Sequence, residues 1–395
     1  MMGPRSTGVG QAISTPFSKP VPVLMTVREL HYGGIERDIT KIASLLDRER
    51  FVPHVATYQI GGMRFEELGR AGIPVLHIPM TSLKSPSAIT SAIRLRNYIR
   101  KNGIRLVHAF DPSAVFVVPI ARALRLPAVL SSTLGNRNLL DRRSHRQMRW
   151  TDGLVDAVVV NCEAMRRHLV DDENVPGERI KLCYNGIATN EFFPAEISRP
   201  AALSEASLVI GTVCVLRPEK AIPLLQEAFA QVLHLDPRMK LLIVGGGPLL
   251  LSLQGNAVKL GIAKASVFVP ATREVATWMR SMDIFALPSY SEAFSNSLLE
   301  AMACGRATVG SRVGGTPELT GANEERGLLF ESGSAGDLAL KLSTLIADAN
   351  LRRTLGNRAA CFVRERLTIE IAAARTASIY ESVLQRAAES HLQSA

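Results

Sequence analysis

The feature that most constrains the fold of this chain is an alternation of short apolar runs with segments whose apolar residues recur at helical spacing. The first run is followed by a glycine loop, His31-Tyr32-Gly33-Gly34, and then by a helical pattern from Ile35 to Leu46. A strand, a glycine loop and a helix in this order begin an α/β unit. The expected strands of this first series are Val21–Val27, Val52–Thr57, Val75–Ile78, Leu106–Ala109, Ala128–Ser131, Ala157–Val160 and Ile180–Tyr184.

A polar segment rich in Pro, Ala and Ser, from Pro194 to Ser207, separates this series from a second one. The strands expected in the second series are Leu208–Val213, Lys240–Val244, Ser266–Val269, Ile284–Leu287 and Thr308–Ser311. At 395 residues the chain exceeds what one hydrophobic core usually supports. We therefore predict an α/β fold of two doubly wound, Rossmann-like domains at residues 21–193 and 208–367, joined by a linker at residues 194–207. A last helix, about residues 368–392, has no strand after it.

Composition excludes several classes of protein. The five cysteines form no CxxC pair and no Cys/His cluster, so we expect buried reduced thiols rather than a disulfide framework or a zinc site. No apolar run reaches about 18 residues, so no transmembrane helix is predicted. Residues 1–20 lack the continuous apolar core of a signal peptide, and we expect them to form a disordered leader.

The net charge of +10 is concentrated in the first half of the chain. Residues 1–200 hold 27 Lys and Arg against 18 Asp and Glu, and the densest basic segment runs from Arg137 to Arg149. If this segment is helical, Arg142, Arg146 and Arg149 share one face. Such a stripe suits an anionic membrane surface or a phosphate-bearing acceptor, and a solvated basic helix is the alternative.

The strongest functional motif runs from Pro288 to Gly305. A strand ends at Pro288, a polar loop carries Glu292, and a helix begins at a Ser295 or Asn296 cap and continues through Glu300. The free amides and the dipole of a helix start favour an anion such as a diphosphate. Helical side chains lean toward the N-terminus, so Glu300 can reach a ribose beside that diphosphate.

This motif resembles the donor signature of glycosyltransferase family 4, which has the GT-B fold of two Rossmann-like domains facing across a cleft. The signature has two glutamates separated by seven residues, and the second glutamate begins the sequence Glu-Ala-Met-Ala-x-Gly. A Gly-Gly-x-x-Glu sequence follows. Here the two glutamates are Glu292 and Glu300, and the two sequences run from Glu300 to Gly305 and from Gly314 to Glu318. The resemblance covers roughly residues 21–390, with further matches at Gly33-Gly34-Ile35-Glu36, Val107-His108-Ala109, Tyr184-Asn185-Gly186-Ile187 and Val244 to Pro248. It implies that the last helix packs back on the first domain.

The phosphate-binding loop of the family is matched only in part, at Leu216 to Lys220. Most members carry an arginine just before the leucine, where this chain has Val215, and a lysine where it has Lys220. Two cations stabilise a leaving diphosphate better than one. Arg217 is a candidate for the second cation, and a surface arginine is the alternative.

The resemblance implies a hexosyltransferase-type enzyme that moves a sugar from a UDP-, GDP- or ADP-sugar to a glycan, lipid-linked or small-molecule acceptor with retention of configuration. The donor would be held by the C-terminal domain and the acceptor by the N-terminal domain. Glu292 would be catalytic, and these residues would bind the donor: Lys220, Arg217, Phe294, Ser295, Asn296, Ser297, Glu300, Gly33 and Gly34.

No metal, other cofactor or nucleic acid is expected, and the acceptor, which the sequence does not identify, is expected to be anionic or lipid-linked. We expect a cytoplasmic protein in peripheral contact with the inner face of the cell membrane. Two alternatives stay open: a nucleotide-sugar epimerase on the same fold, and a non-catalytic scaffold that binds nucleotide sugars.

Overall fold

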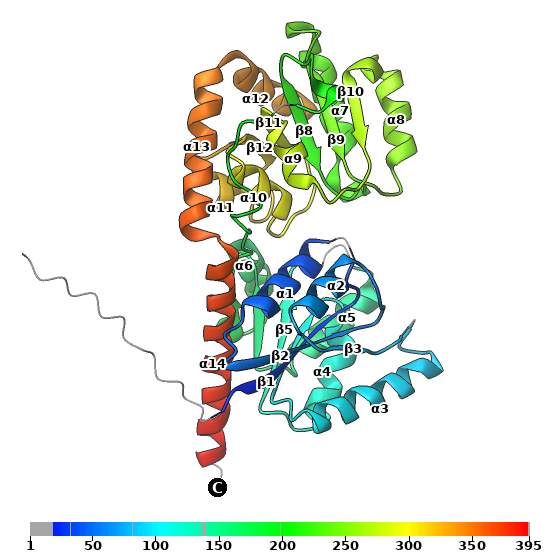
Figure 1. Ribbon diagram of the computed structural model, residues 1–395, viewed down its shortest axis with the longest axis vertical. Coiled ribbons are helices and arrows are strands. Elements are labelled where there is room, and N and C mark those ends of the chain that lie inside the picture. The colour runs from blue at the N-terminus through cyan, green and yellow to red at the C-terminus, as the bar shows by residue number, and fades with distance from the viewer. Residues whose placement is uncertain are drawn as a thin grey trace, which may run out of the picture.

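The computed structural model describes residues 19–31, 33–80, 82–135, 137, 140–197 and 199–393. The expected leader lies outside the described residues, apart from Lys19 and Pro20. Within the described part, the strands form a seven-stranded and a six-stranded sheet, one above the other along the long axis of the molecule (Figure 1). Neighbouring strands are parallel in both sheets. Two doubly wound, Rossmann-like sheets confirm the predicted fold class.

The N-terminal sheet has the order β3-β2-β1-β4-β5-β6-β7, and the C-terminal sheet has the order β10-β9-β8-β11-β12-β13. In each sheet the order reverses beside the first strand, which is the position where doubly wound sheets open a crevice at the carboxyl ends of their strands. The strands are β1 Val21–Val27, β2 Phe51–Thr57, β3 Val75–His77, β4 Leu106–Phe110, β5 Ala128–Thr133, β6 Ala157–Val160, β7 Ile180–Leu182, β8 Val209–Val213, β9 Lys240–Val244, β10 Ser266–Val269, β11 Ile284–Leu287, β12 Ala307–Ser311 and β13 Leu328–Phe330.

The predicted strands all exist, because a strand buried on both faces must be a nearly continuous apolar run. Their ends differ by one or two residues: β5 continues to Thr133, and β7 stops at Leu182 instead of Tyr184. Strand β13, which pairs with β12, was not predicted because three residues are too few to show a pattern.

Helices cover both sheets (Figure 1). Their bounds are α1 Gly34–Leu45, α2 Met63–Arg70, α3 Pro86–Lys101, α4 Ala114–Ala123, α5 Arg142–Asp152, α6 Glu163–Asp171, α7 Ile222–Val232, α8 Leu250–Lys259, α9 Val275–Arg280, α10 Asn296–Ala303, α11 Thr316–Thr320, α12 Ala335–Ala347, α13 Ala349–Arg366 and α14 Ile369–Gln393. Single 3-10 turns occur at Gly177–Arg179, Ala201–Leu203, Pro218–Lys220, Leu233–Leu235 and Ala263–Ala265. Among the described residues, no helix combines the length and the apolar content needed to cross a membrane.

The last helix, α14, returns to the N-terminal sheet after α13 has followed the C-terminal one (Figure 1). Its apolar side chains share a buried cluster with those of β1, β2 and α1. The Tyr380 ring packs edge-on against Phe51 at 5.7 Å between centroids. The Tyr380 hydroxyl lies 2.9 Å from Nδ1 of His108, whose Nε2 is 2.8 Å from the Ser132 hydroxyl. His108 is thus a buried, hydrogen-bonded strand residue.

The described segments that join the two halves run side by side. Ile187 and Thr368 form a parallel bridge, in which the amide of Ile187 donates to Leu367 and the amide of Ile369 donates to Ile187. A Cβ on Gly186 would lie 2.4 Å from the carbonyl oxygen of Thr368. Only glycine therefore allows the two crossing segments to run this close together.

Candidate functional site

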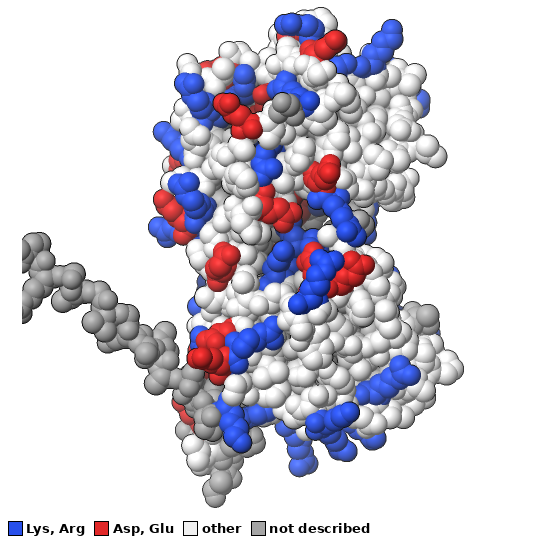
Figure 2. Space-filling view, in the orientation of Figure 1, with Lys and Arg blue, Asp and Glu red and all other residues white. Residues whose placement is uncertain are grey.

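The site begins where β11 ends and α10 starts. The loop between them carries Glu292, and Ser295 is the N-cap of α10, with its hydroxyl accepting from the Leu298 amide at 3.4 Å. The first amides of α10 have no partners within the helix, so this end carries partial positive charge. Figure 2 shows side chains of both charges gathered where the two halves of the molecule meet.

Glu292 and Lys220 come together from separate segments. The Lys220 ammonium donates to Oε1 of Glu292 at 2.6 Å, and the Ser289 hydroxyl donates to the same oxygen at 2.7 Å. Lys220 ends the turn after β8, and the next residue, Ala221, has a φ of 48°. The Glu292 side chain is 9% exposed, so this pair is largely shielded from solvent.

Two glycines, Gly314 and Gly315, contact the backbone of the Glu292 loop. Gly314 has a φ of 50°, and a Cβ there would lie 1.8 Å from the carbonyl oxygen of Glu292. The Gly315 amide donates to the carbonyl of Ala293 at 2.7 Å. The Gly-Gly pair of the motif is therefore needed for backbone contact with the Glu292 loop, a role that the sequence did not reveal.

Glu300 is buried and is ion-paired with Arg37 of α1, from the other half of the molecule. Burial raises the pKa of Glu300, and the Arg37 guanidinium opposes that rise. The sequence indicated Glu300 as a ribose ligand but gave no sign of Arg37, because 263 residues separate the two.

The predicted glycine loop also reaches α10. A Cβ on Gly34 would lie 2.4 Å from the Asn296 amide nitrogen, so the start of α1 touches the start of α10. Asn296 donates to Asp38 at 3.0 Å and accepts from Asn185 at 3.0 Å. Burial raises the pKa of Asp38 to about 6, although Arg37 and Asn296 lower it. Gly33 has an extended backbone, and the atoms nearest to a Cβ there would be those of the Glu36 carboxylate.

The remaining predicted donor residues differ in their exposure. Phe294 is buried with its ring 5.2 Å from that of Tyr184, so its side chain fills the interface between the halves. Ser297 lies on the first turn of α10, with its hydroxyl 3.2 Å from that of Ser295. Arg217 is exposed and makes no ion pair within the described chain. Burial raises the pKa of Glu36 of α1, and the charge of Arg217 opposes that rise.

A cavity of about 360 Å³ lies beside Glu292, between the two halves. His168 of α6 and Asp172 just after it belong to one wall, and the Tyr290–Ala293 loop forms the other. The described residues contain no group of three His, Cys, Asp or Glu side chains that could hold a metal ion.

All five cysteines are described and all are free thiols.

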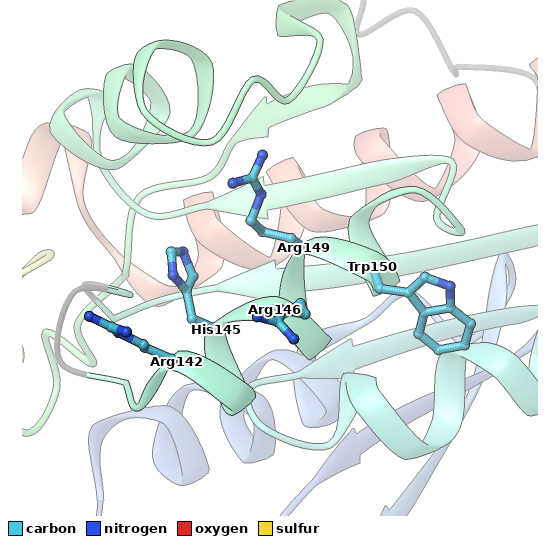
Figure 3. A pocket seen from close by; sticks show the side chains of 5 residues that line it. All are labelled: Arg142, His145, Arg146, Arg149 and Trp150. Atoms are coloured by element: carbon cyan, nitrogen blue, oxygen red, sulfur yellow. The ribbon is translucent and has the colours of Figure 1, made fainter.

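The basic segment of the N-terminal half is helical over Arg142–Asp152 as α5, and Arg142, Arg146 and Arg149 are exposed and line one surface pocket. Arg137 is 1% exposed and pairs with Asp152, with Nη2 and Oδ1 3.0 Å apart, so it is not a surface residue. Arg149 lies 3.5 Å from Glu173. Figure 3 shows Arg142, Arg149 and Trp150 pointing away from one another, around a surface pocket of about 500 Å³.

Comparison with known proteins gives two family matches that together cover most of the chain. The model described as "Glycosyltransferase Family 4" matches residues 32–191, and the model described as "Glycosyl transferases group 1" matches residues 195–361.

Similar curated proteins include a D-inositol 3-phosphate glycosyltransferase of Streptomyces bingchenggensis, 30% identical over 59% of this chain and 54% of that protein. An N-acetyl-alpha-D-glucosaminyl L-malate synthase of Bacillus anthracis is 30% identical over 53% of this chain and 55% of that protein. The chain thus spans about half the length of the curated relatives that it matches. The crystal structure of Anabaena HepE in complex with UDP and glucose aligns with a TM-score of 0.80 at 20% identity, over 92% of this chain and all of that one.

Proposed function

Because the chain belongs to glycosyltransferase family 4, with its GT-B fold, we propose that it transfers a hexose-type sugar from a nucleotide-diphosphate sugar to an acceptor with retention of configuration. The observation that carries the proposal is the meeting of Glu292, Lys220 and the free amides of α10 at the junction of the two halves. Complexes of the similar HepE structure with UDP support a nucleotide donor.

In this mechanism the C-terminal half holds the donor. Lys220 and the α10 amides stabilise the charge that develops on the leaving diphosphate, and Glu292 contacts the sugar and its cationic transition state. The acceptor hydroxyl attacks from the side of the leaving group, and a phosphate oxygen takes its proton. The bond to the diphosphate breaks as the bond to the acceptor oxygen forms, and the protein mainly orients both substrates. No metal cofactor is part of the proposal, because the family resemblance implies charge stabilisation by protein groups.

We further propose that the acceptor is anionic and is bound by the N-terminal half. Residues 1–200 carry 27 Lys and Arg against 18 Asp and Glu. The similar curated proteins are named for inositol 3-phosphate and for malate, both of which are anionic. A lipid-linked anionic acceptor would also fit, and five free thiols suit the reducing cytoplasm.

Peripheral membrane contact completes the proposal, and α3 supports it as a second basic surface besides α5. Residues 68–110 contain seven Lys and Arg and no Asp or Glu. On α3, Ile89 and Ile93 are 68% and 46% exposed among these bases. In Figure 2 the lower right part of the molecule, where α3 lies in Figure 1, shows basic side chains and no acidic ones. Exposed apolar residues beside bases favour an anionic membrane surface.

Co-sedimentation with vesicles tests this contact. We expect salt-sensitive binding to anionic vesicles and none to zwitterionic ones, with weaker binding after Ile89→Ser and Ile93→Ser. Serine substitutions of Arg142 and Arg146 test the contribution of α5. Equal binding by the α3 variants and the unchanged protein would show that α3 is not the contact surface.

The function itself is tested by thermal shift with UDP-, GDP- and ADP-sugars, because a ligand of the native state raises its stability. The sugar that stabilises is then incubated with inositol phosphates and malate, and the products are analysed by mass spectrometry. We expect one donor to stabilise the protein and to yield a glycosylated acceptor. Conversion of the donor without an acceptor would favour an epimerase, and binding without turnover would favour a non-catalytic scaffold.

A further inference from the structure

The ion pair between Arg37 and Glu300 crosses the junction between the two halves. The Arg37 side chain is 12% exposed and that of Glu300 is 7% exposed. A buried ion pair is weak evidence for stability, because removing both charges from water opposes their attraction. This pair is therefore better explained by what it does to the site, in which Glu300 is the proposed ribose ligand.

Neighbouring side chains fix the position of Arg37. Its Nε lies 3.6 Å from Asp38, and its guanidinium carbon lies 5.9 Å from the centre of the Phe192 ring. The remaining nitrogen, Nη2, is buried and has no hydrogen-bond partner among the described residues. A buried N–H group normally has a partner, so this one is available to an oxygen atom placed beside Glu300.

We propose that Arg37 is a positioning residue for the donor, which acts from the N-terminal half by holding the Glu300 carboxylate charged and oriented toward the ribose hydroxyls. The inference rests on the proposed function, because it names how the ribose end of that donor site works. An ionised carboxylate accepts hydrogen bonds at both oxygens, whereas a protonated one loses part of this capacity to its own O–H group. Since burial raises the pKa of Glu300 and Arg37 lowers it, Arg37 favours the form that accepts.

The contact also makes ribose recognition depend on how close the two halves are. Arg37 belongs to α1, and Glu300 belongs to α10. Gly34 touches Asn296, and Asn296 is bonded to Asp38, so the same two helix starts meet at several points. Arg37 reaches Glu300 only while α1 lies against α10. The ion pair of Arg37 with Glu300, which positions the proposed ribose-binding carboxylate, therefore forms only when the cleft is closed at this point.

Binding of UDP, GDP and ADP, and of their 2′-deoxy analogues, tests the proposal by isothermal calorimetry. We expect the unchanged protein to bind its preferred ribonucleotide about tenfold or more tightly than the deoxy analogue, as loss of a charge-assisted hydrogen bond implies. Arg37→Met should lose most of this preference, because it weakens ribonucleotide binding more than binding of the deoxynucleotide, which keeps only the 3′-hydroxyl. Arg37→Lys should retain part of the preference.

A pH series and a double variant separate positioning from simple stability. The loss of ribonucleotide affinity on acidification should begin at a higher pH in Arg37→Met, because Glu300 then loses the cation that keeps it ionised. Arg37→Met combined with Glu300→Gln should be no weaker than Glu300→Gln alone. The matched control is Arg50→Met, which removes an ion pair to Glu381 of α14, away from the site, and should leave the ribose preference unchanged.

Several outcomes would overturn the inference. An Arg37→Met protein that keeps the preference for the ribonucleotide shows that Arg37 does not act on the ribose, and so does equal weakening toward both nucleotides. If Arg37→Met does not fold, Arg37→Lys decides: an unchanged preference and pH profile contradict the proposal. If the unchanged protein binds none of the nucleotides, the proposed function fails together with the inference. If it binds them and only the Arg37 prediction fails, the proposed function stands.

Discussion

At the scale of single residues, the contacts of the Glu292 carboxylate determine how charge is arranged in the site. The carboxylate of Glu292 is held by Lys220 at 2.6 Å and by Ser289 at 2.7 Å, so it is oriented before any ligand arrives. A diphosphate that bound beside the α10 amides would compete with Glu292 for the Lys220 ammonium. In the proposed function, the Lys220 ammonium therefore exchanges the Glu292 carboxylate for a phosphate oxygen when the donor binds.

Lys220→Ala should lower the affinity for a nucleoside diphosphate by about tenfold or more and leave affinity for the nucleoside nearly unchanged, because only the diphosphate gains a charge-assisted bond. Calorimetry with UDP, GDP or ADP and the matching nucleoside measures both. Arg217→Ala is the comparison variant, because Arg217 is the exposed cation of the same loop. Equal losses for nucleotide and nucleoside in Lys220→Ala would contradict a phosphate role.

Gly314→Ala should lower kcat at least about tenfold and change the nucleotide affinity much less. The new Cβ would lie 1.8 Å from the Glu292 carbonyl, at a φ of 50°, so the Glu292 loop must move. The amides of α10 do not depend on that contact. Gly336→Ala is the control, because a Cβ at Gly336 meets nothing within 4 Å. A Gly314→Ala protein with unchanged kcat would show that the position of Glu292 is unimportant.

At the scale of elements, β4 and α14 are joined through His108. The His108 ring is 2% exposed and bonded at both nitrogens, and burial lowers its pKa to about 3. The folded protein therefore keeps His108 neutral in a range where an unfolded histidine takes up a proton. This difference makes the joint between sheet and helix sensitive to acid.

The stability contributed by His108 should be complete above about pH 6.5 and should fall as the pH drops toward 3, by up to about 1.4 kcal/mol per pH unit. His108→Gln should show a shallower loss over this range, starting from a stability about 1–3 kcal/mol lower near pH 7.5. Urea denaturation in a Trp278→Phe background lets Trp150 report on the N-terminal half. His234→Gln is the exposed control. Parallel pH profiles for His108→Gln and the parent would refute this assignment.

The elements show how far the sequence alone reaches. Strands buried on both faces were found because their apolar runs are local signals, and the Ser295 cap was found because capping is local too. Strand β13 was missed because it has three residues. The burial of Arg137 was not predicted, because the sequence does not show that its guanidinium bonds to Asp152 and Thr133. Arg37 was not predicted for the same reason, because its proposed role depends on Glu300, which is distant in the sequence.

On the scale of the whole molecule, Glu318 connects the two halves. Its carboxylate accepts from the first amides of α6, Glu163 at 3.0 Å and Ala164 at 2.9 Å, and from the Tyr184 hydroxyl at 2.9 Å. A carboxylate at a helix N-terminus meets the positive end of the helix dipole. Glu318 of α11 therefore holds the N-terminal half against the C-terminal half on the side of α6.

Glu318→Ala should widen the junction, because two α6 amides and the Tyr184 hydroxyl lose their acceptor at a cost of about 1–3 kcal/mol. Small-angle X-ray scattering should show a larger radius of gyration than for the unchanged protein. Glu331→Ala, at an exposed position of the same half, should show no change. An unaltered radius for Glu318→Ala would mean that the remaining contacts are enough to keep the halves together.

The return of α14 to the N-terminal sheet determines the order in which the two halves can complete their folding during translation. The side chains that close the core around β1 and β2, among them Ile379, Tyr380 and Leu384, are translated after both sheets. The C-terminal sheet has all of its strands by Phe330, whereas the half that begins the chain still lacks one wall. The N-terminal half is thus translated first but completes its core last. A chain released after residue 366 would lack α14, and the core of its N-terminal half would be exposed.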